Sequence, residues 1–275
     1  MKLKLWQVDA FASRPFEGNP AAIVLLENWL PDETLQAIAL ENNLSETGYL
    51  VRKSDGEYAL RWFTPATEVD LCGHATLASA WVLFNEFSVD TDLVRFDTRN
   101  GVLEIARDGD RLAMSLPAGN TEPYSSPAGF AEKLGASLGG DAPSEILIAP
   151  RGAGGAAGLV AIFDEASLRQ ATFSSALQAL LDDAKVGALL ATAQGNPPYD
   201  FVSRFFAPAM GIAEDPVTGS AHASLAPFWA KRLGKKTLRA FQASARGGDI
   251  LCTDEGARVT LLGNCTLYMR GEIEI

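Results

Sequence analysis

The sequence carries one pattern of reactive and small residues twice. Arg61 begins the motif R-x-[FW]-x-P-A and His74 begins the motif H-A-[ST]-L-A-x-x-W, and Arg204 and His222 begin the second copies. The histidines at positions 74 and 222 are 148 residues apart, a little over half of the 275-residue chain. An internal duplication explains this spacing better than chance does, and the motifs predict that the two histidines occupy equivalent places.

In each copy a short β-rich run leads through a loop to an apolar helix that starts near the histidine. The first N–H groups of a helix are unpaired and lie at the positive end of its dipole, so each start can attract an anion. Two such starts facing across a pseudo-twofold axis would hold a small carboxylate. The second loop is five residues longer (18 against 13, from arginine to histidine) and adds Glu214, Asp215 and Pro216, so we expect the two halves of the site to differ chemically.

Two carboxylates are candidates for acid–base chemistry. Glu46 lies among apolar and small residues, where a carboxylate is poorly solvated and suited to proton transfer. The alternative for Glu46 is an exposed loop carboxylate or a helix cap. Its equivalent in the second copy is Leu189, so Asp215 is the obvious supplier of a second acid. Asp215 lies five residues before Ser220 at a helix start, and helix capping is the alternative role for Asp215.

The histidines and cysteines leave further alternatives open. His74 and His222 are the only histidines, and each could be structural or could belong to the site. Neither lies in an H-x-x-E or H-x₃-H spacing, so we expect no metal ion. Cys72 could be a nucleophile or base activated by the helix start, or a buried inert thiol. Three cysteines, widely spaced, favour reduced thiols over a disulfide framework.

Composition excludes several classes of partner. The net charge of −11 argues against a protein that binds nucleic acid. The N-terminus lacks a secretory apolar core and no stretch is long and apolar enough to span a membrane. The sequence therefore predicts a cytoplasmic globular protein.

Strand and helix patterns predict an α+β fold of two similar lobes. The strands that follow the helix at 74–87 form a meander and not a βαβ series, and residues 18–20 form a turn. Residues 117–127 are rich in Pro, Gly, Ser and Thr and are the best candidate linker. We expect residues 1–117 to form an N-terminal lobe, which the C-terminal tail could complete, and residues 118–275 a C-terminal lobe. The cleft between two lobes is the natural place for the active site.

Seven motifs, spread over nearly the whole chain, carry a family resemblance: Val8–Phe11, Gly18–Pro20, Leu44–Thr47, Arg61–Pro65, Leu71–Thr76, Glu214–Ser220 and Gln242–Gly248. With these residues the chain resembles the PhzF family, named for the phenazine biosynthesis isomerase, and through it the diaminopimelate epimerase fold. The resemblance implies two pseudo-symmetric lobes, each a curled, mostly antiparallel sheet around a central helix, assembled as a homodimer and working without a cofactor.

The resemblance also implies roles for single residues. In the isomerase the matching glutamate moves a proton between carbons of a dihydro-hydroxyanthranilate ring. Carried over to this chain, that glutamate is Glu46, and the residues expected to assist it are His74, Asp215 and Ser220. The residues expected to bind the substrate are Gly73 and Gly219, through their backbone N–H groups, together with Asn19, Cys72 and Arg246.

The related epimerases use two cysteines, one at each helix start. Counting from the histidines, the equivalent of Cys72 is Ser220, whose hydroxyl is too basic when ionised to replace a thiolate. A two-thiol racemase is therefore disfavoured. The leading interpretation is a cofactor-independent isomerase of a small unsaturated or hydroxylated carboxylic acid. The alternative is a family member that binds a small acid or a protein without turnover.

Overall fold

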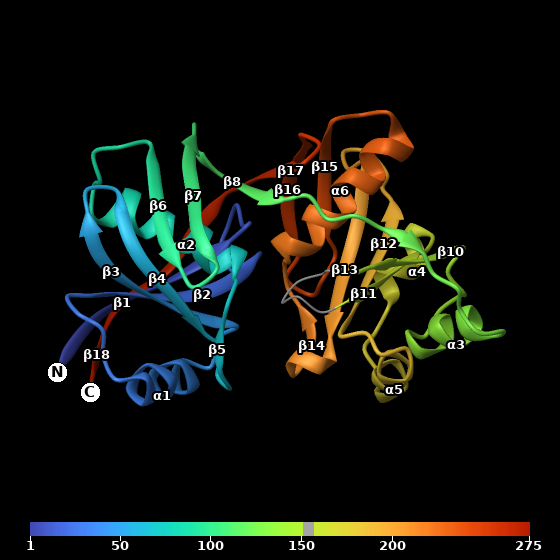
Figure 1. Cartoon of the computed structure of the whole chain (residues 1–275), viewed down its shortest axis with the longest axis horizontal. Helices are drawn as coiled ribbons and strands as arrows, with labels where there is room; N and C mark the ends of the chain where they lie inside the picture. The colour runs from blue at the N-terminus through green and yellow to red at the C-terminus, as the bar shows by residue number, and fades with distance from the viewer. Residues whose placement is uncertain (151–156) are drawn as a thin grey trace. The chain divides into compact units, whose positions relative to one another are not determined.

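A computed structural model describes residues 1–150 and 157–275 of the chain, and Figure 1 shows its course. These residues form two compact units. Unit 1 contains Met1–Ser115 and Leu262–Ile275, and unit 2 contains Leu116–Leu261. The C-terminal segment thus completes the unit in which the chain begins.

Unit 1 is a curled sheet that encloses helix α2 (Figure 1). Its strands pair in the order β18, β1, β2, β3, β4, β6, β7, β8. Its elements are β1 Lys2–Ala10, β2 Asn19–Leu26, α1 Asp32–Asn42, β3 Glu46–Ser54, β4 Glu57–Phe63, β5 Glu68–Val69, α2 Gly73–Glu86, β6 Leu93–Thr98, β7 Gly101–Asp108, β8 Arg111–Pro117 and β18 Cys265–Glu274.

Helix α2 is buried because it carries small or apolar residues on nearly all sides. Ten of its 14 residues are buried, which is typical of a helix inside a core and not on its surface. Its polar side chains are accommodated by hydrogen bonds to the helix itself. Thr76 Oγ1 donates to the carbonyl of Cys72 at 2.6 Å, and Ser79 Oγ donates to the carbonyl of Ala75 at 2.7 Å. The helix therefore fills the curled sheet without leaving these hydroxyls unpaired.

Unit 2 has the same construction around helix α6. From β10 to β16 its pairings run antiparallel, parallel, antiparallel, parallel, antiparallel, as they do from β1 to β7 in unit 1. The predicted duplication is therefore present in the strand order. The elements are β9 Glu122–Pro123, α3 Phe130–Ser137, β10 Glu145–Ala149, β11 Gly158–Ile162, α4 Glu165–Gln170, α5 Ser175–Asp183, β12 Ala188–Gln194, β13 Phe201–Ala207, the 3₁₀ turn η2 Pro208–Met210, β14 Ile212–Asp215, α6 Gly219–Leu233, β15 Thr237–Gln242, β16 Gly248–Asp254 and β17 Arg258–Gly263.

The predicted α+β fold of curled, mostly antiparallel sheets around central helices is confirmed, and the strands after α2 form the predicted meander, with β6, β7 and β8 paired antiparallel in chain order. The parallel pairs were not predicted. Each unit contains two parallel pairs, β2–β3 and β4–β6 in unit 1 and β11–β12 and β13–β15 in unit 2. Parallel neighbours need a crossover connection, and the helices supply it: α1 and α2 in unit 1, and α4 with α5, then α6, in unit 2. Helix α4 was not predicted.

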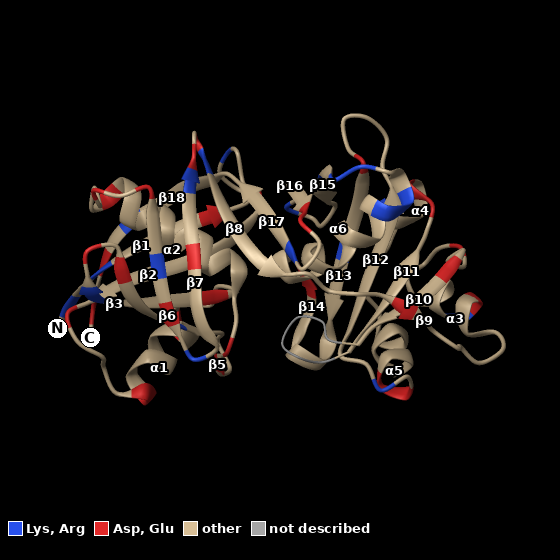
Figure 2. Ribbon diagram, turned by 45° about the horizontal axis from the view of Figure 1, so that its top comes forward, with Lys and Arg blue, Asp and Glu red and all other residues tan. Residues whose placement is uncertain are grey.

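The surface of each unit carries both signs of charge. Figure 2 shows Lys and Arg interspersed with Asp and Glu along the strands and loops, and ion pairs such as Arg95–Glu104 join them. Among the residues that the structure describes, no helix is long and apolar enough to cross a membrane.

Candidate active site

Two neighbouring strands of unit 1 begin with a polar side chain. Asn19 is the first residue of β2 and Glu46 is the first residue of β3, and these strands are parallel neighbours, so their starts lie at one edge of the sheet. The predicted turn at 18–20 is therefore partly wrong, because Asn19 already belongs to the strand. Gly18 makes this entry tight: its φ is +64°, and a Cβ there would lie 2.1 Å from the carbonyl oxygen of Ala10.

Helix α2 brings two more site residues to the same place. It begins at Gly73, with Cys72 as its N-cap and His74 as its second residue. Among the described residues, the Cys72 side chain accepts no hydrogen bond from the first turn. The positive end of the helix is thus left without an N-cap side chain, as a site for an anion requires.

These four side chains converge around the imidazole of His74. Glu46 Oε2 lies 2.9 Å from His74 Nε2, Asn19 Nδ2 lies 3.1 Å from Nδ1, and Cys72 Sγ lies 3.5 Å from Nδ1. All four residues are at most 8% exposed. When the imidazole is protonated, Glu46 Oε2 and His74 Nε2 therefore form a buried ion pair.

Burial and charge set the protonation of this cluster. Burial, reinforced by the charge of Glu46, raises the pKa of the Cys72 thiol to about 11. Burial alone would lower the pKa of His74, but Cys72 and Glu46 outweigh it, so the pKa of His74 lies well above its ordinary value. Because the thiol stays protonated at neutral pH, the carboxylate of Glu46 is the group that stabilises the imidazolium. An Asn19 amide turned by 180° would present its oxygen to the protonated Nδ1.

Unit 2 holds the other predicted site residues near the start of α6. This helix begins at Gly219, with Thr218 as its N-cap, and Ser220 is its second residue and half-buried. Thr218 Oγ1 donates a hydrogen bond to the Asp215 carboxylate at the end of β14. Arg246 lies in the loop between β15 and β16 and is half-buried.

A buried glutamine fixes the loop that carries Asp215. Gln242 is 0% exposed, accepts from the Thr218 backbone N–H at 2.9 Å and donates to the Asp215 carbonyl at 2.7 Å. Gln242 was not among the predicted site residues, although it begins the motif at 242–248. A side-chain amide has both a hydrogen-bond donor and an acceptor, so Gln242 can bind a backbone carbonyl and a backbone N–H of the same loop at once. This explains why an amide occupies the position.

The structure corrects the matching of the two histidines. His74 is the second residue of α2, whereas His222 is the fourth residue of α6, so the two are not equivalent. The strand registers agree: Trp62 pairs with Val69 and Phe205 pairs with Asp215, which places Asp215 where the first copy has Val69. The equivalent of Cys72 is therefore Thr218 and not Ser220, and Ser220 is the equivalent of His74.

His222 has a structural environment. It is 0% exposed, its Nδ1 lies 2.8 Å from the carbonyl oxygen of Thr218, and its Nε2 lies 3.2 Å from Ser203 Oγ. A carbonyl accepts only, so Nδ1 carries the proton and Nε2 accepts from the hydroxyl. Burial lowers the pKa of His222 to about 4, and the ring is neutral at pH 7.

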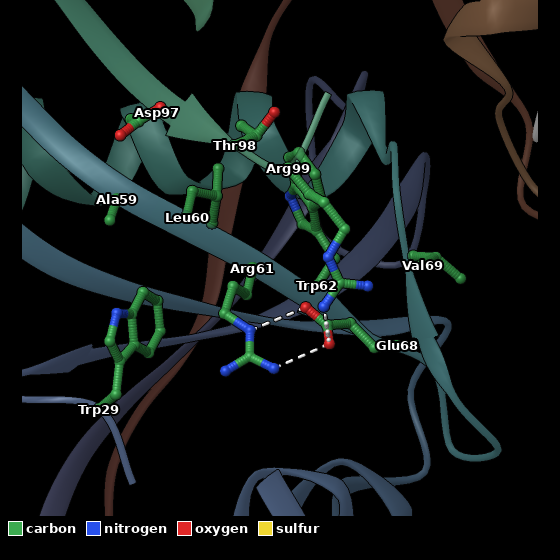
Figure 3. A pocket seen from close by; sticks show the side chains of 10 residues that line it. All are labelled: Trp29, Ala59, Leu60, Arg61, Trp62, Glu68, Val69, Asp97, Thr98 and Arg99. Carbon is green, nitrogen blue, oxygen red and sulfur yellow. Dashed lines mark hydrogen bonds and ion pairs between the residues drawn. The ribbon is translucent and has the colours of Figure 1, made fainter. Parts of the chain in front are cut away.

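Matched arginine–glutamate pairs hold the loops that precede both helix starts. Arg61 Nε and Nη2 donate to the two carboxylate oxygens of Glu68 at 2.7 and 2.8 Å, at a pocket of about 280 Å³ shown in Figure 3. Arg204 binds Glu214 in the same bidentate way, with Nη2 2.7 Å from Oε2. Each glutamate lies four residues before the N-cap of its helix. The arginines common to both motifs thus anchor the approach to each helix.

The predicted site residues therefore fall into two groups. Unit 1 holds Asn19, Glu46, Cys72, Gly73 and His74, and the structure brings their side chains and helix start together. Unit 2 holds the second group, which consists of Asp215, Gly219, Ser220 and Arg246. The approach of one group to the other remains a prediction of the sequence analysis.

Comparison with known proteins decides the family. The model of the family described as phenazine biosynthesis-like protein (PhzC-PhzF) matches residues 8–271, nearly the whole chain. The chain belongs to the PhzF family. An uncharacterized isomerase of Pseudomonas aeruginosa is 48% identical over 280 residues, which cover 100% of both chains.

Solved structures agree with this membership. A PhzF family protein of Enterococcus faecalis has 41% sequence identity, 100% coverage of both chains and a TM-score of 0.90. A predicted epimerase of Pseudomonas aeruginosa has 21% identity, 99% coverage of both chains and a TM-score of 0.75. At that identity the second likeness concerns the fold, which this PhzF chain shares with epimerase-like proteins.

Proposed function

We propose that this PhzF protein is a cofactor-independent isomerase that moves a proton between carbons of a small unsaturated or hydroxylated carboxylic acid. The observation that carries the proposal is the buried Glu46 carboxylate, whose Oε2 lies 2.9 Å from His74 Nε2 beside a helix start. A carboxylate has two oxygens, so one can pair with His74 while the other accepts the substrate proton. Relatives named as isomerases support the reaction class.

In the proposed reaction Glu46 acts first as base and then as acid. Its carboxylate takes a proton from a substrate carbon, the C–H electron pair becomes part of a shifted double bond, and the same carboxyl group returns the proton to another carbon on the same face. No electrons are gained or lost overall. His74 keeps its own proton and stabilises the negative charge of Glu46 before transfer and after product formation.

The substrate carboxylate is bound, in this proposal, by backbone N–H groups of the two helix starts, at Gly73 and Gly219. Helix starts without an N-cap hydrogen bond, such as that of α2, leave these donors for a ligand. The other residues assigned to the site are Asp215 and Ser220 as assisting groups, and Asn19, Cys72 and Arg246 as substrate contacts.

Two other functions make different predictions. A racemase with opposed thiols needs a second cysteine at the start of α6, and Thr218 stands at the position equivalent to Cys72. A non-catalytic member would bind the same small acid without exchanging its protons. The second alternative needs an isotope measurement, because binding alone occurs in both cases.

The test is incubation of the protein with dihydro-hydroxyanthranilate and related acids in D₂O, followed by NMR. The proposal expects the shifted double bond, with deuterium at a ring or chain carbon where the carboxyl proton exchanges with solvent before it is returned. Binding of these acids with neither a shifted double bond nor deuterium uptake in any of them would favour the non-catalytic alternative and contradict the proposal.

A further inference from the structure

The cluster around His74 contains three kinds of metal-ligand atom within one small volume. Glu46 offers a carboxylate oxygen, Cys72 a sulfur and His74 a ring nitrogen, and these atoms lie within 4.8 Å of one another. The residues come from β3, the N-cap of α2 and its second position, so no sequence spacing typical of a metal site connects them. The convergence is visible only in the folded chain.

The distances are close to those of tetrahedral coordination. With Zn–S bonds of about 2.3 Å and Zn–N and Zn–O bonds of about 2.1 Å, tetrahedral angles separate S from N by about 3.6 Å and N from O by about 3.4 Å. In this protein Cys72 Sγ lies 3.9 Å from His74 Nε2, and Glu46 Oε2 lies 2.9 Å from the same nitrogen. Side-chain shifts of about 0.5 Å would bring both separations to the values expected for zinc.

The surroundings of the cluster also fit a cation. Asn19 contacts Nδ1 of His74, which leaves Nε2 to Glu46. Cys72 Sγ lies 3.5 Å from Nδ1 and 3.9 Å from Nε2, within reach of both ring nitrogens. Metal-ligating histidines are commonly oriented in this way, by a polar partner on the other ring nitrogen. Glu46 is 8% exposed, and its Oε2 lies 2.9 Å from His74 Nε2. A buried carboxylate is stabilised by a neighbouring cation, and a bound metal ion can take that place when the imidazole has lost its proton.

The set of donors selects the class of cation. One thiol, one imidazole and one carboxylate suit Zn²⁺ and similar thiophilic ions, whereas Mg²⁺ and Ca²⁺ prefer oxygen ligands alone. Three protein ligands leave the fourth tetrahedral position to water or to a small acid. We propose that Glu46, Cys72 and His74 form a binding site for a thiophilic divalent cation.

One consequence rests on the proposed function. A cation bound to the Glu46 carboxylate engages the group that would take the proton, so the ion is an inhibitor of the isomerase and not its cofactor. Bound ions require the deprotonated thiol and neutral imidazole, so binding also releases protons from the cluster. Removal of the cation by a chelator should therefore increase isotope exchange in protein that has been loaded with zinc.

The test uses Co²⁺ as a spectroscopic substitute for Zn²⁺ on the full-length, chelator-treated protein. We expect one Co²⁺ per chain, with a sulfur-to-metal charge-transfer band that Zn²⁺ abolishes by competition. Cys72→Ser should remove the band, and Glu46→Gln should weaken Zn²⁺ binding by at least about tenfold. Cys265→Ser, the same substitution outside the cluster, should change neither quantity.

The outcomes separate this proposal from the proposed function. A wild-type protein without the band, or a band that persists in Cys72→Ser, would overturn the cation site. If Cys72→Ser does not fold, Glu46→Gln provides the test. An unchanged Zn²⁺ affinity in Glu46→Gln would likewise overturn the cation site. Isotope exchange measured in the presence of chelator tests the isomerase alone, so either proposal can fail without the other.

Discussion

Glu46 and Cys72 both lie beside the imidazole of His74, but they differ as acid–base groups. Burial raises the pKa of Cys72 to about 11, so at neutral pH only a very small fraction is thiolate. The thiol is also 5% exposed, which limits its access to reagents. Glu46 is a carboxylate whose Oε2 lies 2.9 Å from His74 Nε2, and its negative charge is stabilised by the imidazolium. At the scale of single residues, the carboxylate is the better proton shuttle.

We therefore predict that Cys72→Ala remains active. The substitution removes the sulfur but leaves the Glu46–His74 contact, so turnover should fall by less than about tenfold, well below the loss of about 10²- to 10⁴-fold that follows removal of a general base. Iodoacetamide should likewise leave turnover unchanged, because alkylation needs an accessible thiolate. An inactive Cys72→Ala with native circular dichroism would instead assign the base to the thiol.

His222 gives a prediction about stability that needs no substrate. Its pKa is about 4 in the folded protein and about 6.5 when unfolded, so the unfolded chain binds more protons between these values. The folded protein therefore keeps its full free energy of unfolding, as far as His222 is concerned, above pH 6.5. It loses part of that free energy as the pH falls toward 4. The loss should be on the order of 2–3 kcal/mol at the acidic end.

The measurement is urea unfolding of the wild type and of His222→Gln at pH 7 and pH 4.5. The variant should be less stable at pH 7, and the gap between the two proteins should narrow by about 2 kcal/mol at pH 4.5. His74, with its raised pKa, contributes in the opposite direction, but it is present in both proteins and cancels. A gap that stays constant with pH would show that His222 is not held neutral by burial.

At the scale of elements, the two arginine–glutamate pairs each hold the loop that precedes a central helix, but the arginine in unit 2 is more deeply buried. The Arg204 side chain is 8% exposed, and its remaining partners are the carbonyls of Leu168 and Ala171. The Arg61 side chain is 20% exposed and also pairs with Asp32. Loss of the glutamate therefore leaves Arg204 as a buried charge without a carboxylate among the described residues, whereas Arg61 keeps one.

Glu214→Gln should consequently destabilise the protein more than Glu68→Gln. We expect about 3 kcal/mol for the first change, as for a broken buried pair, and about 1 kcal/mol for the second. Urea denaturation of the two variants gives both values. Equal losses, or a larger one for Glu68→Gln, would contradict the structural difference between the pairs.

Element boundaries show what sequence patterns could predict. The apolar pattern located α2 to within one residue, since this helix begins directly after a loop and runs into apolar residues. It placed the start of α6 three residues too late, because Gly219 and Ser220 carry no apolar signal. The wrong matching of His74 with His222 has the same origin. The two motifs were aligned by residue identity, whereas the helix starts and strand registers show that the two histidines are not equivalent.

At the scale of the whole molecule, the motifs predicted the fold and most residues of the unit 1 cluster, but not their contacts. Asn19 and His74 are 55 residues apart in sequence, and their contact depends on parallel pairings of strands that the sequence patterns did not predict. Gln242 was missed because a lone glutamine in a turn motif carries no signal of burial. Local patterns specify elements, whereas long-range strand order specifies which side chains meet.

We also predict that the protein is a homodimer. The expectation rests on the family resemblance and on sheet edges that an open curled sheet leaves unpaired. Sedimentation at micromolar concentration should give about twice the 29.3 kDa mass of the chain. A single species at the monomer mass across the accessible concentrations would exclude the dimer.

The central claim is that Glu46 moves the proton, and Glu46→Gln in the D₂O exchange experiment tests it most directly. The amide keeps the shape of the side chain but cannot accept and return a proton, so deuterium uptake should fall by about 10²- to 10⁴-fold. Substrate binding, followed by NMR shifts of the ligand, should persist. Cys72→Ala is the matched control and should exchange at nearly the wild-type rate. An active Glu46→Gln alongside an inactive Cys72→Ala would contradict the account.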